Sequence, residues 1–368
     1  MAELDYISIK GFKSISSIER LALRPINVII GPNGSGKSNF IGVFSFLHAV
    51  REGALRDYVA KAGGAERILH FGSKRTGKIE ISISFQNEVN QYYLQLQPTS
   101  DDLLYPSMEL AYFWDKSRFQ RPYSTGLSSV GGEAGISAKN LRGTSDFVRE
   151  HLGRWRLYHF HDTSSSSPMK KTADINDNRF LRPDGSNLSA FLYFLQQKHP
   201  DSFKLISGAI RQVAPFFEGF VLAPLRLNTE KIRLEWKNSA SDQYFDASSL
   251  SDGTMRFIAL ATLLLQPIEY RPSVVLVDEP ELGLHPYAIT LLASMIKQAS
   301  KSTQVIVSTQ SPLLLDHFSP EDVLVANLVN ESTEFTRLDS DSLKVWLEEF
   351  SLGQLWEKNE IGGRPGGG

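Results

Sequence analysis

The sequence predicts an α/β fold built around a parallel β-sheet, and three observations predict it. The apolar run 26–30 leads into a glycine-rich loop and then into a segment with helical periodicity. Two later runs, 274–277 and 304–307, are continuous and rich in β-branched residues, which is typical of strands buried on both faces of a parallel sheet. Segments that alternate apolar and polar residues, such as 78–85, indicate an additional antiparallel part.

The composition is that of an ordinary globular protein. The chain has 368 residues, of which 41% are hydrophobic and 22% charged, so it has room for one large domain or for a core with an inserted lobe. It contains no cysteine, which excludes disulfides, Cys₄ zinc sites and thiol catalysis. No apolar run reaches the length of a membrane span and the N-terminus does not resemble a signal peptide, so we expect a cytoplasmic protein with no membrane partner.

Periodicity places the expected elements along the chain. Two strands, 6–10 and 21–30, precede the glycine-rich loop, and the helix after it runs to about residue 51 or 55. Strands at 78–85, 91–96 and 108–114 suggest an antiparallel meander. Further along, the pattern predicts strands at 154–160, 231–237, 274–279, 304–308 and 334–338, and helices around 188–195, 203–213 and 255–265.

Two stretches, 116–144 and 161–185, are polar and show little periodicity, and we expect irregular structure there. The first combines basic and aromatic side chains, namely Lys116, Arg118, Phe119, Arg121 and Tyr123. Such a mixture can contact nucleic acid, but a charged, solvated loop is the more common explanation of such a pattern and is the one we favour. The net charge of the chain is only −2, so any nucleic-acid binding would have to come from a local patch such as this one.

The glycine-rich loop is Gly31-Pro32-Asn33-Gly34-Ser35-Gly36-Lys37-Ser38. It has the P-loop spacing of a glycine, four residues and then Gly-Lys-Ser, and it lies between a strand and a helix as that motif requires. Glycines allow several backbone N–H groups to surround phosphate oxygens, and the helix N-terminus adds positive potential. Lys37 would reach the outer phosphates of a nucleotide, and Ser38 would ligate Mg²⁺.

A second helix N-terminus follows Leu250-Ser251-Asp252-Gly253-Thr254. It offers anion-binding N–H groups, but it carries no lysine. Taken alone, a Ser-Asp-Gly sequence at this position is usually only a helix cap. Its place in the chain between the P-loop and the acidic strand described next favours a functional role.

Two buried strands end in polar residues. The run 274–277 is followed by Asp278 and Glu279, and the run 304–308 leads to Gln310. Because the carboxyl ends of parallel strands meet at one edge of a sheet, these side chains should face the same phosphates. The carboxylate of Asp278 suits a divalent metal, and Glu279 can orient or deprotonate an attacking water.

Taken together, these motifs resemble the ATP-binding-cassette head of the RecF, SMC and OLD-like ATPases, most of all the stand-alone ATPases of prokaryotic defence or toxin-like operons. The likeness rests on the P-loop with its following Asn39, on 250–253, on 278–281 and on 282–286. The expected fold is a P-loop ATPase head with an antiparallel β lobe and an inserted helical and loop lobe. The expected division is an ATPase core at 1–86 and 230–345, an inserted lobe at 87–229, and a C-terminal helix with a flexible glycine-rich tail at 346–368.

The resemblance implies ATP and Mg²⁺ as ligands and a composite site in a homodimer. Each P-loop would face the signature segment of a second molecule, so ATP would bridge two heads and hydrolysis would release them. The implied catalytic residues are Glu279, Gln310 and Lys37, and the implied metal ligands are Ser38 and Asp278. The implied nucleotide-binding residues are Asn33, Gly34, Ser35, Gly36, Lys37, Ser38, Asn39, Ser251 and Gly253.

The sequence departs from the family in two respects. Relatives usually carry a histidine where this chain has Gln310, which cannot hold a positive charge, so we expect slow hydrolysis. The glutamine loop that normally helps to coordinate Mg²⁺ has two candidates, Gln86 and His161-Asp162. The acidic pair Asp339 and Asp341 is read as a solvated turn, because too few residues follow it to build a Toprim-like nuclease.

The main functional hypothesis is an ATP-dependent switch or sensor subunit that controls a separately encoded, nuclease-like effector in anti-phage defence or a toxin-like system. The motivation for this hypothesis is that the motifs form a complete ATPase core, whereas no output domain is visible in the sequence. The alternative is a RecF-like ATPase that maintains or repairs DNA. The missing heptad repeat argues against an SMC arm, and a transporter subunit fits neither the signature context nor the large insertion.

Overall fold

The computed structural model describes residues 4–363. They form two compact units, the first made of residues 4–156 and 319–363 and the second of residues 157–318. The P-loop belongs to the first unit, whereas Ser251, Asp278 and Gln310 belong to the second. The two units are defined by compactness and not by motifs. The predicted boundaries of the ATPase core and the inserted lobe therefore stay a prediction.

The first unit contains a six-stranded antiparallel sheet with the order β2-β1-β4-β5-β6-β7. In its central strands β4 and β5 the buried residues alternate along the chain, as Ile79, Ile81 and Ile83 do in β4. The predicted meander is therefore present. The strands are β1 (Leu4–Phe12), β2 (Ile15–Ala22), β4 (Ile79–Phe85), β5 (Asn90–Pro98), β6 (Leu104–Phe113) and β7 (Tyr123–Gly126).

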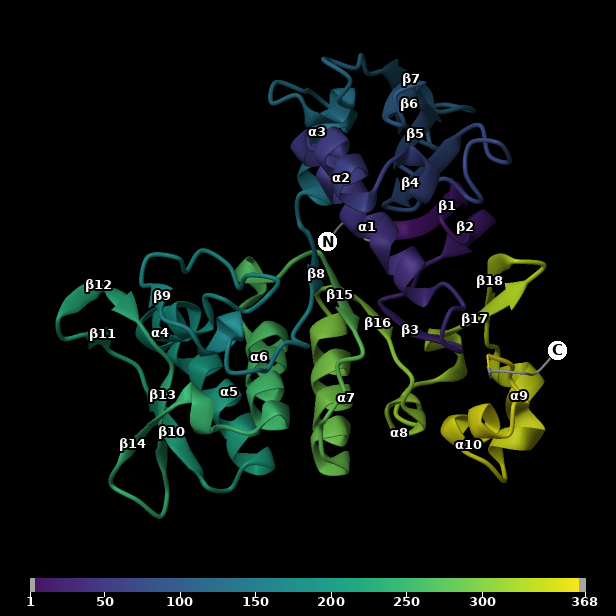
Figure 1. Ribbon diagram of the computed structural model, residues 1–368. Helices are drawn as coiled ribbons and strands as arrows, with labels where there is room; N and C mark the ends of the chain where they lie inside the picture. The colour runs from purple at the N-terminus through teal and green to yellow at the C-terminus, as the bar shows by residue number, and fades with distance from the viewer. Residues whose placement is uncertain (1–3, 364–368) are drawn as a thin grey trace. The chain divides into compact units, whose positions relative to one another are not determined.

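Helix α1 (Lys37–Glu52) is the long helix of the first unit (Figure 1). It buries its apolar side chains, and Phe46 packs against Phe12 of β1 with ring centroids 5.4 Å apart. Gly53 ends the helix in a left-handed conformation. The other helices of this unit are α2 (Leu55–Ala62), α3 (Thr144–Leu152), α9 (Ser340–Leu347) and α10 (Leu352–Glu357).

A second group of strands in the first unit leads into and supports the P-loop. Strand β3 (Ile26–Ile30) is fully buried and pairs in parallel with β17 (Val323–Val329), which in turn pairs in antiparallel fashion with β18 (Ser332–Arg337). Three strands thus precede the P-loop, and the prediction of two was wrong. A bulge between Ile7 and Ile9 shifts the pairing of β1 with β2, so β2 buries Ile15 and Ile18 without the strict alternation that we used as the signal.

The second unit contains the two strands with polar ends. Strands β15 (Val274–Asp278) and β16 (Gln304–Ser308) pair in parallel, with Asp278 opposite Ser308. Helices α6 (Asp252–Leu265) and α7 (Pro286–Ser300) lie side by side in this unit, and α5 (Pro200–Val213) lies next to α6 (Figure 1). Both strands form as predicted, because short apolar runs rich in β-branched residues are typical of strands buried on both faces of a parallel sheet.

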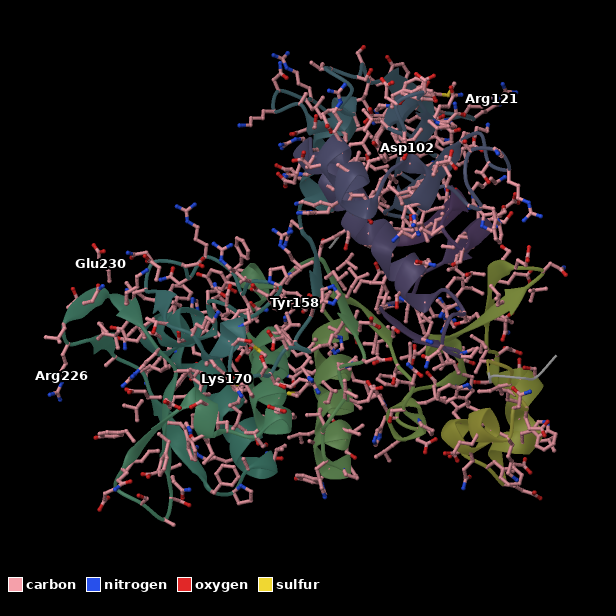
Figure 2. The ribbon with its side chains drawn as sticks, viewed as in Figure 1. Asp102, Arg121, Tyr158, Lys170, Arg226 and Glu230 are labelled. Atoms are coloured by element: carbon pink, nitrogen blue, oxygen red, sulfur yellow. The ribbon has the colours of Figure 1, made fainter. Side chains whose placement is uncertain are left out.

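The rest of the second unit consists of short elements. The predicted single strand 231–237 is wrong, since Arg233 and Leu234 separate two strands that join different three-stranded sheets. The sheets are β11-β12-β9, from Pro224–Leu225, Asn228–Ile232 and Ala173–Asp174, and β10-β13-β14, from Phe217–Val221, Glu235–Asn238 and Tyr244–Asp246. The remaining helices are α4 (Leu188–Lys198) and α8 (Pro312–Leu315), while β8 (Trp155–Tyr158) spans the boundary between the units and ends at Tyr158 (Figure 2).

The region 116–144 is more ordered than its composition indicated, since it includes β7 and the buried residues Ala134 and Ile136. The carboxylate of Glu109 organises it by accepting the N–H groups of Gly135 at 2.6 Å and Ile136 at 2.8 Å. Two of its cations pair with carboxylates, Lys116 with Glu88 and Arg118 with Asp115, at 3.2 and 3.3 Å. Arg121 lies at the outer edge of this unit (Figure 2). Pairing of this kind is what the solvated-loop alternative expects.

Of the predicted glycine-rich tail, residues 364–368 lie outside the described part of the chain, and Gly363 donates its N–H to Asn327 of β17 at 3.0 Å. Asp339 caps α9 by accepting the N–H of Ser342. No helix among residues 4–363 is long and apolar enough to cross a membrane.

Candidate functional site

The P-loop closes on itself around Lys37. Its ammonium group donates to the backbone oxygens of Gly31 at 2.6 Å and Pro32 at 2.9 Å, and the side chain is almost fully buried. Gly36 caps α1 with φ of 96°, a left-handed conformation that favours glycine. The N-terminal N–H groups of α1 therefore stay unobstructed by a side chain at this position, as phosphate binding requires.

Ser14, Asn39 and Thr333 form a hydrogen-bonded cluster next to the last glycine of the P-loop. The hydroxyls of Ser14 and Thr333 are 2.7 Å apart, and Asn39 Nδ2 donates to the Ser14 hydroxyl at 2.8 Å. A Cβ atom on Gly36 would lie only 2.0 Å from the Thr333 hydroxyl. Thr333 is fully buried, so it packs closely against the backbone of Gly36, where α1 begins. The sequence analysis missed Ser14 and Thr333, because no local pattern distinguishes them from other strand residues.

A hollow of about 730 Å³ opens beside the start of α1 in the first unit. Asn39, the residue after Ser38, contributes to one wall, and Lys13 adds a cation whose pKa is lowered by burial. Phe71 is half exposed and presents an aromatic surface. The lining residues are Lys13, Asn39, Ala62, Glu66, Arg67, Leu69, Phe71 and Gly72.

In the second unit, the structure brings Glu279 and Gln310 together. Glu279 follows β15 with φ of 40°, which is a strained conformation for a residue with a side chain. Its N–H donates to the Ser308 oxygen at 2.8 Å, so the end of β16 holds the turn. The side-chain amide of Gln310 donates to the Glu279 carboxylate. The predicted convergence of these two strand ends is therefore confirmed.

The signature segment forms the N-terminus of α6. The Ser251 hydroxyl accepts the N–H of Thr254 at 3.2 Å, which makes Ser251 the helix cap. Gly253 lies against the loop after β15, where an added Cβ would approach the Gly283 oxygen to 2.4 Å. Ser251 and Asp252 are exposed, and Lys170 pairs with Asp252 at 3.7 Å (Figure 2).

Neither candidate for the glutamine loop shows a special role. Gln86 sits in the turn between β4 and β5, where its side-chain oxygen accepts Asn90 Nδ2 at 2.8 Å. Asp162 accepts the N–H and hydroxyl of Ser164. His159 directly follows β8, and its pKa is lowered, mainly by burial and also by the nearby His161. The carboxylate of Asp278, a predicted metal ligand, acts in the opposite direction and raises this pKa. The sequence predicted His161-Asp162 in this segment and did not point to His159.

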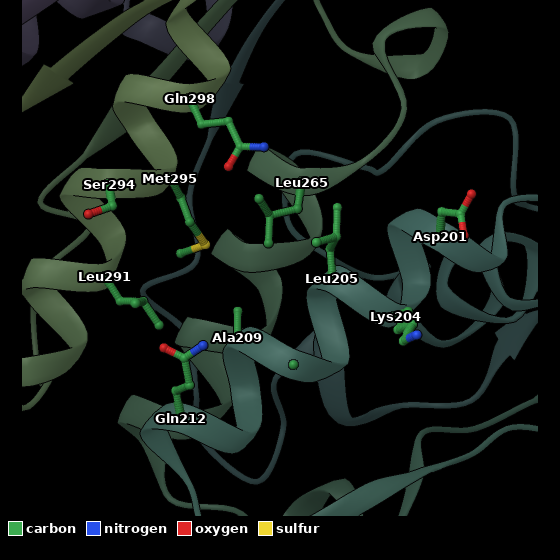
Figure 3. Close-up of a pocket in the computed structure, with 11 residues that line it drawn as sticks. Asp201, Lys204, Leu205, Ala209, Gln212, Leu265, Leu291, Ser294, Met295 and Gln298 are labelled. Carbon is green, nitrogen blue, oxygen red and sulfur yellow. The ribbon is translucent and has the colours of Figure 1, made fainter.

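A separate groove lies among α5, α6 and α7 in the second unit (Figure 3). Leu205, Leu265 and Met295 form an apolar floor, and Gln212 and Gln298 lie on the rim. Its volume is about 640 Å³. None of the residues predicted to bind nucleotide or metal lines it, so the groove is a feature distinct from the candidate site.

The fold and these motifs define the class of protein. A buried strand, a P-loop and a helix in one unit, with a signature helix and two parallel strands ending in acidic and amide residues in the other, are the parts of an ABC-type ATPase head of the RecF and SMC kind. The chain belongs to the family described as "AAA domain, putative AbiEii toxin, Type IV TA system", whose model matches residues 26–316.

Solved structures show the same fold. An SMC head bound to the C-terminal winged-helix domain of ScpA matches with a TM-score of 0.60 and 16% identity, covering 92% of this chain and 99% of that chain. An SMC head with an extended coiled coil, bound to the C-terminal domain of ScpA derived from Pyrococcus furiosus, matches with a TM-score of 0.57 and 15% identity, covering 95% and 99%. The predicted fold class is thus confirmed.

One curated relative also matches over a short stretch. The chromosome partition protein Smc of Mycolicibacterium paratuberculosis (strain ATCC BAA-968 / K-10) is 29% identical over 101 residues, which is 26% of this chain. The matching segment spans only 8% of the length of that relative. The likeness therefore agrees with the head fold, and the activity of the longer protein does not transfer with it.

Proposed function

We propose that this protein binds and hydrolyses ATP with Mg²⁺, slowly, and that ATP joins two copies into a switch. The P-loop fits a triphosphate in this structure, because Lys37 is held by carbonyl groups of its own loop, which phosphate oxygens can replace as partners. The hydroxyl of Ser35 is buried and makes no hydrogen bond within residues 4–363. A buried hydroxyl of this kind is suited to an oxygen-rich ligand.

The hollow beside α1 suits the nucleoside end of ATP. It starts at Asn39, one residue after the predicted metal ligand Ser38, so base and ribose would extend from the phosphates in that direction. Phe71 can stack on a purine, and Lys13 and Arg67 add positive charge near the phosphates. These features support ATP over a simple anion.

The predicted metal ligands are hard oxygen donors, the Ser38 hydroxyl and the Asp278 carboxylate, and this is the donor chemistry that Mg²⁺ prefers. When bound, Mg²⁺ supplies positive charge that neutralises the phosphates during transfer. Glu279 is proposed to orient and deprotonate the attacking water. Gln310 would hold Glu279 in place through its amide and would contact the outer phosphate.

The exposed signature segment is the observation that carries the switch. Ser251 and Asp252 are open to solvent at the N-terminus of a 14-residue helix, where a phosphate of a second molecule would be stabilised. Next to it, on the loop after β15 and the start of α7, Leu282 and Tyr287 are 50% and 51% exposed. Large exposed apolar side chains of this kind are suited to a protein interface.

We further propose that the ATP-bound dimer controls a separately encoded, nuclease-like effector of a defence or toxin-like system. The family description points to a toxin–antitoxin context. Purification of the tagged protein from cells that carry its neighbouring reading frames tests this proposal, with ATP and then with ADP. An effector that co-purifies in the ATP state supports it. A protein that purifies alone and is active alone contradicts it.

Changing Gln310 to His should raise the ATP turnover several-fold. A protonated imidazole can hold a positive charge near the outer phosphate, whereas the amide of Gln310 can only donate a neutral hydrogen bond. Steady-state phosphate release at saturating ATP measures the effect, and Gln298→His, in the exposed rim of the groove, serves as the control. An unchanged or lower rate would count against this role of Gln310.

Changing Thr333 to Val should weaken ATP binding by about fivefold, since a single lost hydrogen bond is worth about 1 kcal/mol. The hydroxyl that links Ser14 to the underside of Gly36 would be lost while the size of the side chain stays the same. Thr333→Ser should restore binding. Thr336→Val, on the exposed face of the same strand, is the matched control. Isothermal titration with a non-hydrolysable ATP analogue measures the affinity, and equal affinity of Thr333→Val and wild type would refute the role.

A further inference from the structure

Glu281 is a buried carboxylate on the loop between β15 and α7, and the roles proposed above do not use it. Its side chain is only 9% exposed, and burial raises the pKa of its carboxyl group. A carboxylate in such a place needs donors to offset its lost hydration. Oε1 has two of them: the Thr309 hydroxyl at 2.5 Å and the Gln310 N–H at 3.3 Å.

Both donors belong to the segment that follows β16, which carries the predicted phosphate contact. The backbone of Gln310 is held by Glu281 and its side-chain amide by Glu279. The Thr309 hydroxyl accepts the N–H of Ser311 at 3.0 Å, and Ser311 caps α8. Glu281 thus lies at the start of a hydrogen-bonded chain that fixes the whole turn from the end of β16 to α8.

The other oxygen of Glu281 makes the arrangement unusual. Oε2 is buried and has no hydrogen-bond partner among the described residues. A second buried charge in this unit is Arg256, on the signature helix α6. Burial lowers the pKa of Arg256, and the carboxylates of Asp252 and Glu281 raise it.

Arg256 makes its hydrogen bonds to backbone oxygens elsewhere in the unit. Its guanidinium donates to the backbone oxygens of Phe160 at 3.0 Å and His161 at 3.1 Å. The hydrogen bonds of the Glu281 carboxylate instead connect its loop to Thr309 and Gln310. If the carboxylate served only to fill space, an apolar residue would avoid the desolvation penalty that it carries.

We propose that Glu281 is a positioning residue that holds Thr309 and Gln310 so that the Gln310 amide stays on the Glu279 carboxylate. Glu281 contacts neither substrate nor metal in this scheme, and it acts through Gln310. Its effect on catalysis rests on the proposed ATPase function. Its effect on the position of the segment does not.

Two substitutions separate the parts of this role. Glu281→Gln keeps a carbonyl oxygen where Thr309 and Gln310 donate, and it places an amide where Oε2 has no hydrogen bond. Glu281→Ala removes the acceptor altogether. Thr309→Val removes one donor while leaving Glu281 in place, and Thr309→Ser restores it. Because Glu281→Gln and Thr309→Val are close in shape to the native side chains, they test the proposal even if Glu281→Ala folds poorly.

Steady-state ATP hydrolysis tests the catalytic consequence. Glu281→Ala should lower kcat about tenfold or more, by analogy with other residues that orient a reacting side chain, with KM for ATP unchanged. Glu281→Gln should keep most of the activity, and Glu230→Ala, an exposed glutamate of the same unit, should keep all of it. In a Gln310→Ala background, Glu281→Ala should have little further effect, because both changes remove the same interaction.

Two outcomes overturn the proposal: a kcat loss that multiplies with that of Gln310→Ala, or a rise in KM with kcat unchanged. Amide hydrogen exchange supplies a readout that does not need hydrolysis. The Gln310 amide should exchange faster in Glu281→Ala than in wild type or Glu230→Ala. If wild type does not hydrolyse ATP, the proposed function fails and exchange still tests the role of Glu281. Unchanged exchange at Gln310 contradicts that role in either case.

Discussion

Glu279→Gln is expected to lower ATP hydrolysis by about a hundredfold or more, because a positioned general base contributes at least that much to such reactions. The amide has nearly the same shape as the carboxylate and keeps an oxygen that can accept the Gln310 amide. ATP binding should therefore persist while its breakdown stops. ATP-bound dimers should then accumulate, since in the proposed switch hydrolysis is the step that would release them.

Phosphate release and light scattering, both with ATP and Mg²⁺, measure the two effects on the same sample. Glu230→Gln is the matched control, because Glu230 lies exposed in the same unit on β12 (Figure 2). It should hydrolyse ATP like wild type and show no extra dimer. A Glu279→Gln protein that stays monomeric would contradict the composite-site proposal. One that hydrolyses ATP at the wild-type rate would contradict the role of Glu279 as the base.

Lys37→Ala is expected to abolish detectable hydrolysis, with a loss of about a hundredfold or more. In the proposed site, the ammonium group of Lys37 would be the P-loop charge nearest to the outer phosphates. Its two partners, the oxygens of Gly31 and Pro32, would be left without a donor. ATP-induced dimers should also disappear, which distinguishes this variant from Glu279→Gln.

The matched control for this change is Lys61→Ala, at the exposed last turn of α2 in the same unit. Circular dichroism and thermal unfolding should show that both variants remain folded, because α1 keeps its apolar contacts. Titration with ATP and the hydrolysis assay then measure binding and turnover. Full ATP binding by Lys37→Ala would show that the triphosphate does not lie in the P-loop.

Much of the fold follows from local sequence patterns. The strand, loop and helix from Ile26 to Glu52 form as predicted, because a buried apolar run, a glycine-rich loop and a helical periodicity each leave a local signal. The parallel pair β15 and β16 was equally clear, and with it the meeting of Glu279 and Gln310. Errors arose where the local signal is weak, as in the bulged pair β1 and β2 and in the strand broken at Arg233.

The sequence by itself determined the motifs of this protein: a P-loop with Lys37, a helix start at Ser251, and acidic residues at the end of a buried strand. These features depend on residues close together in the chain, so spacing alone reveals them. Only the tertiary structure decided what supports them. Thr333 lies 319 residues from Ser14, and Glu281 meets Thr309 across 28 residues. A hydrogen bond between such distant residues has no periodicity, and it becomes visible only when the strands are packed.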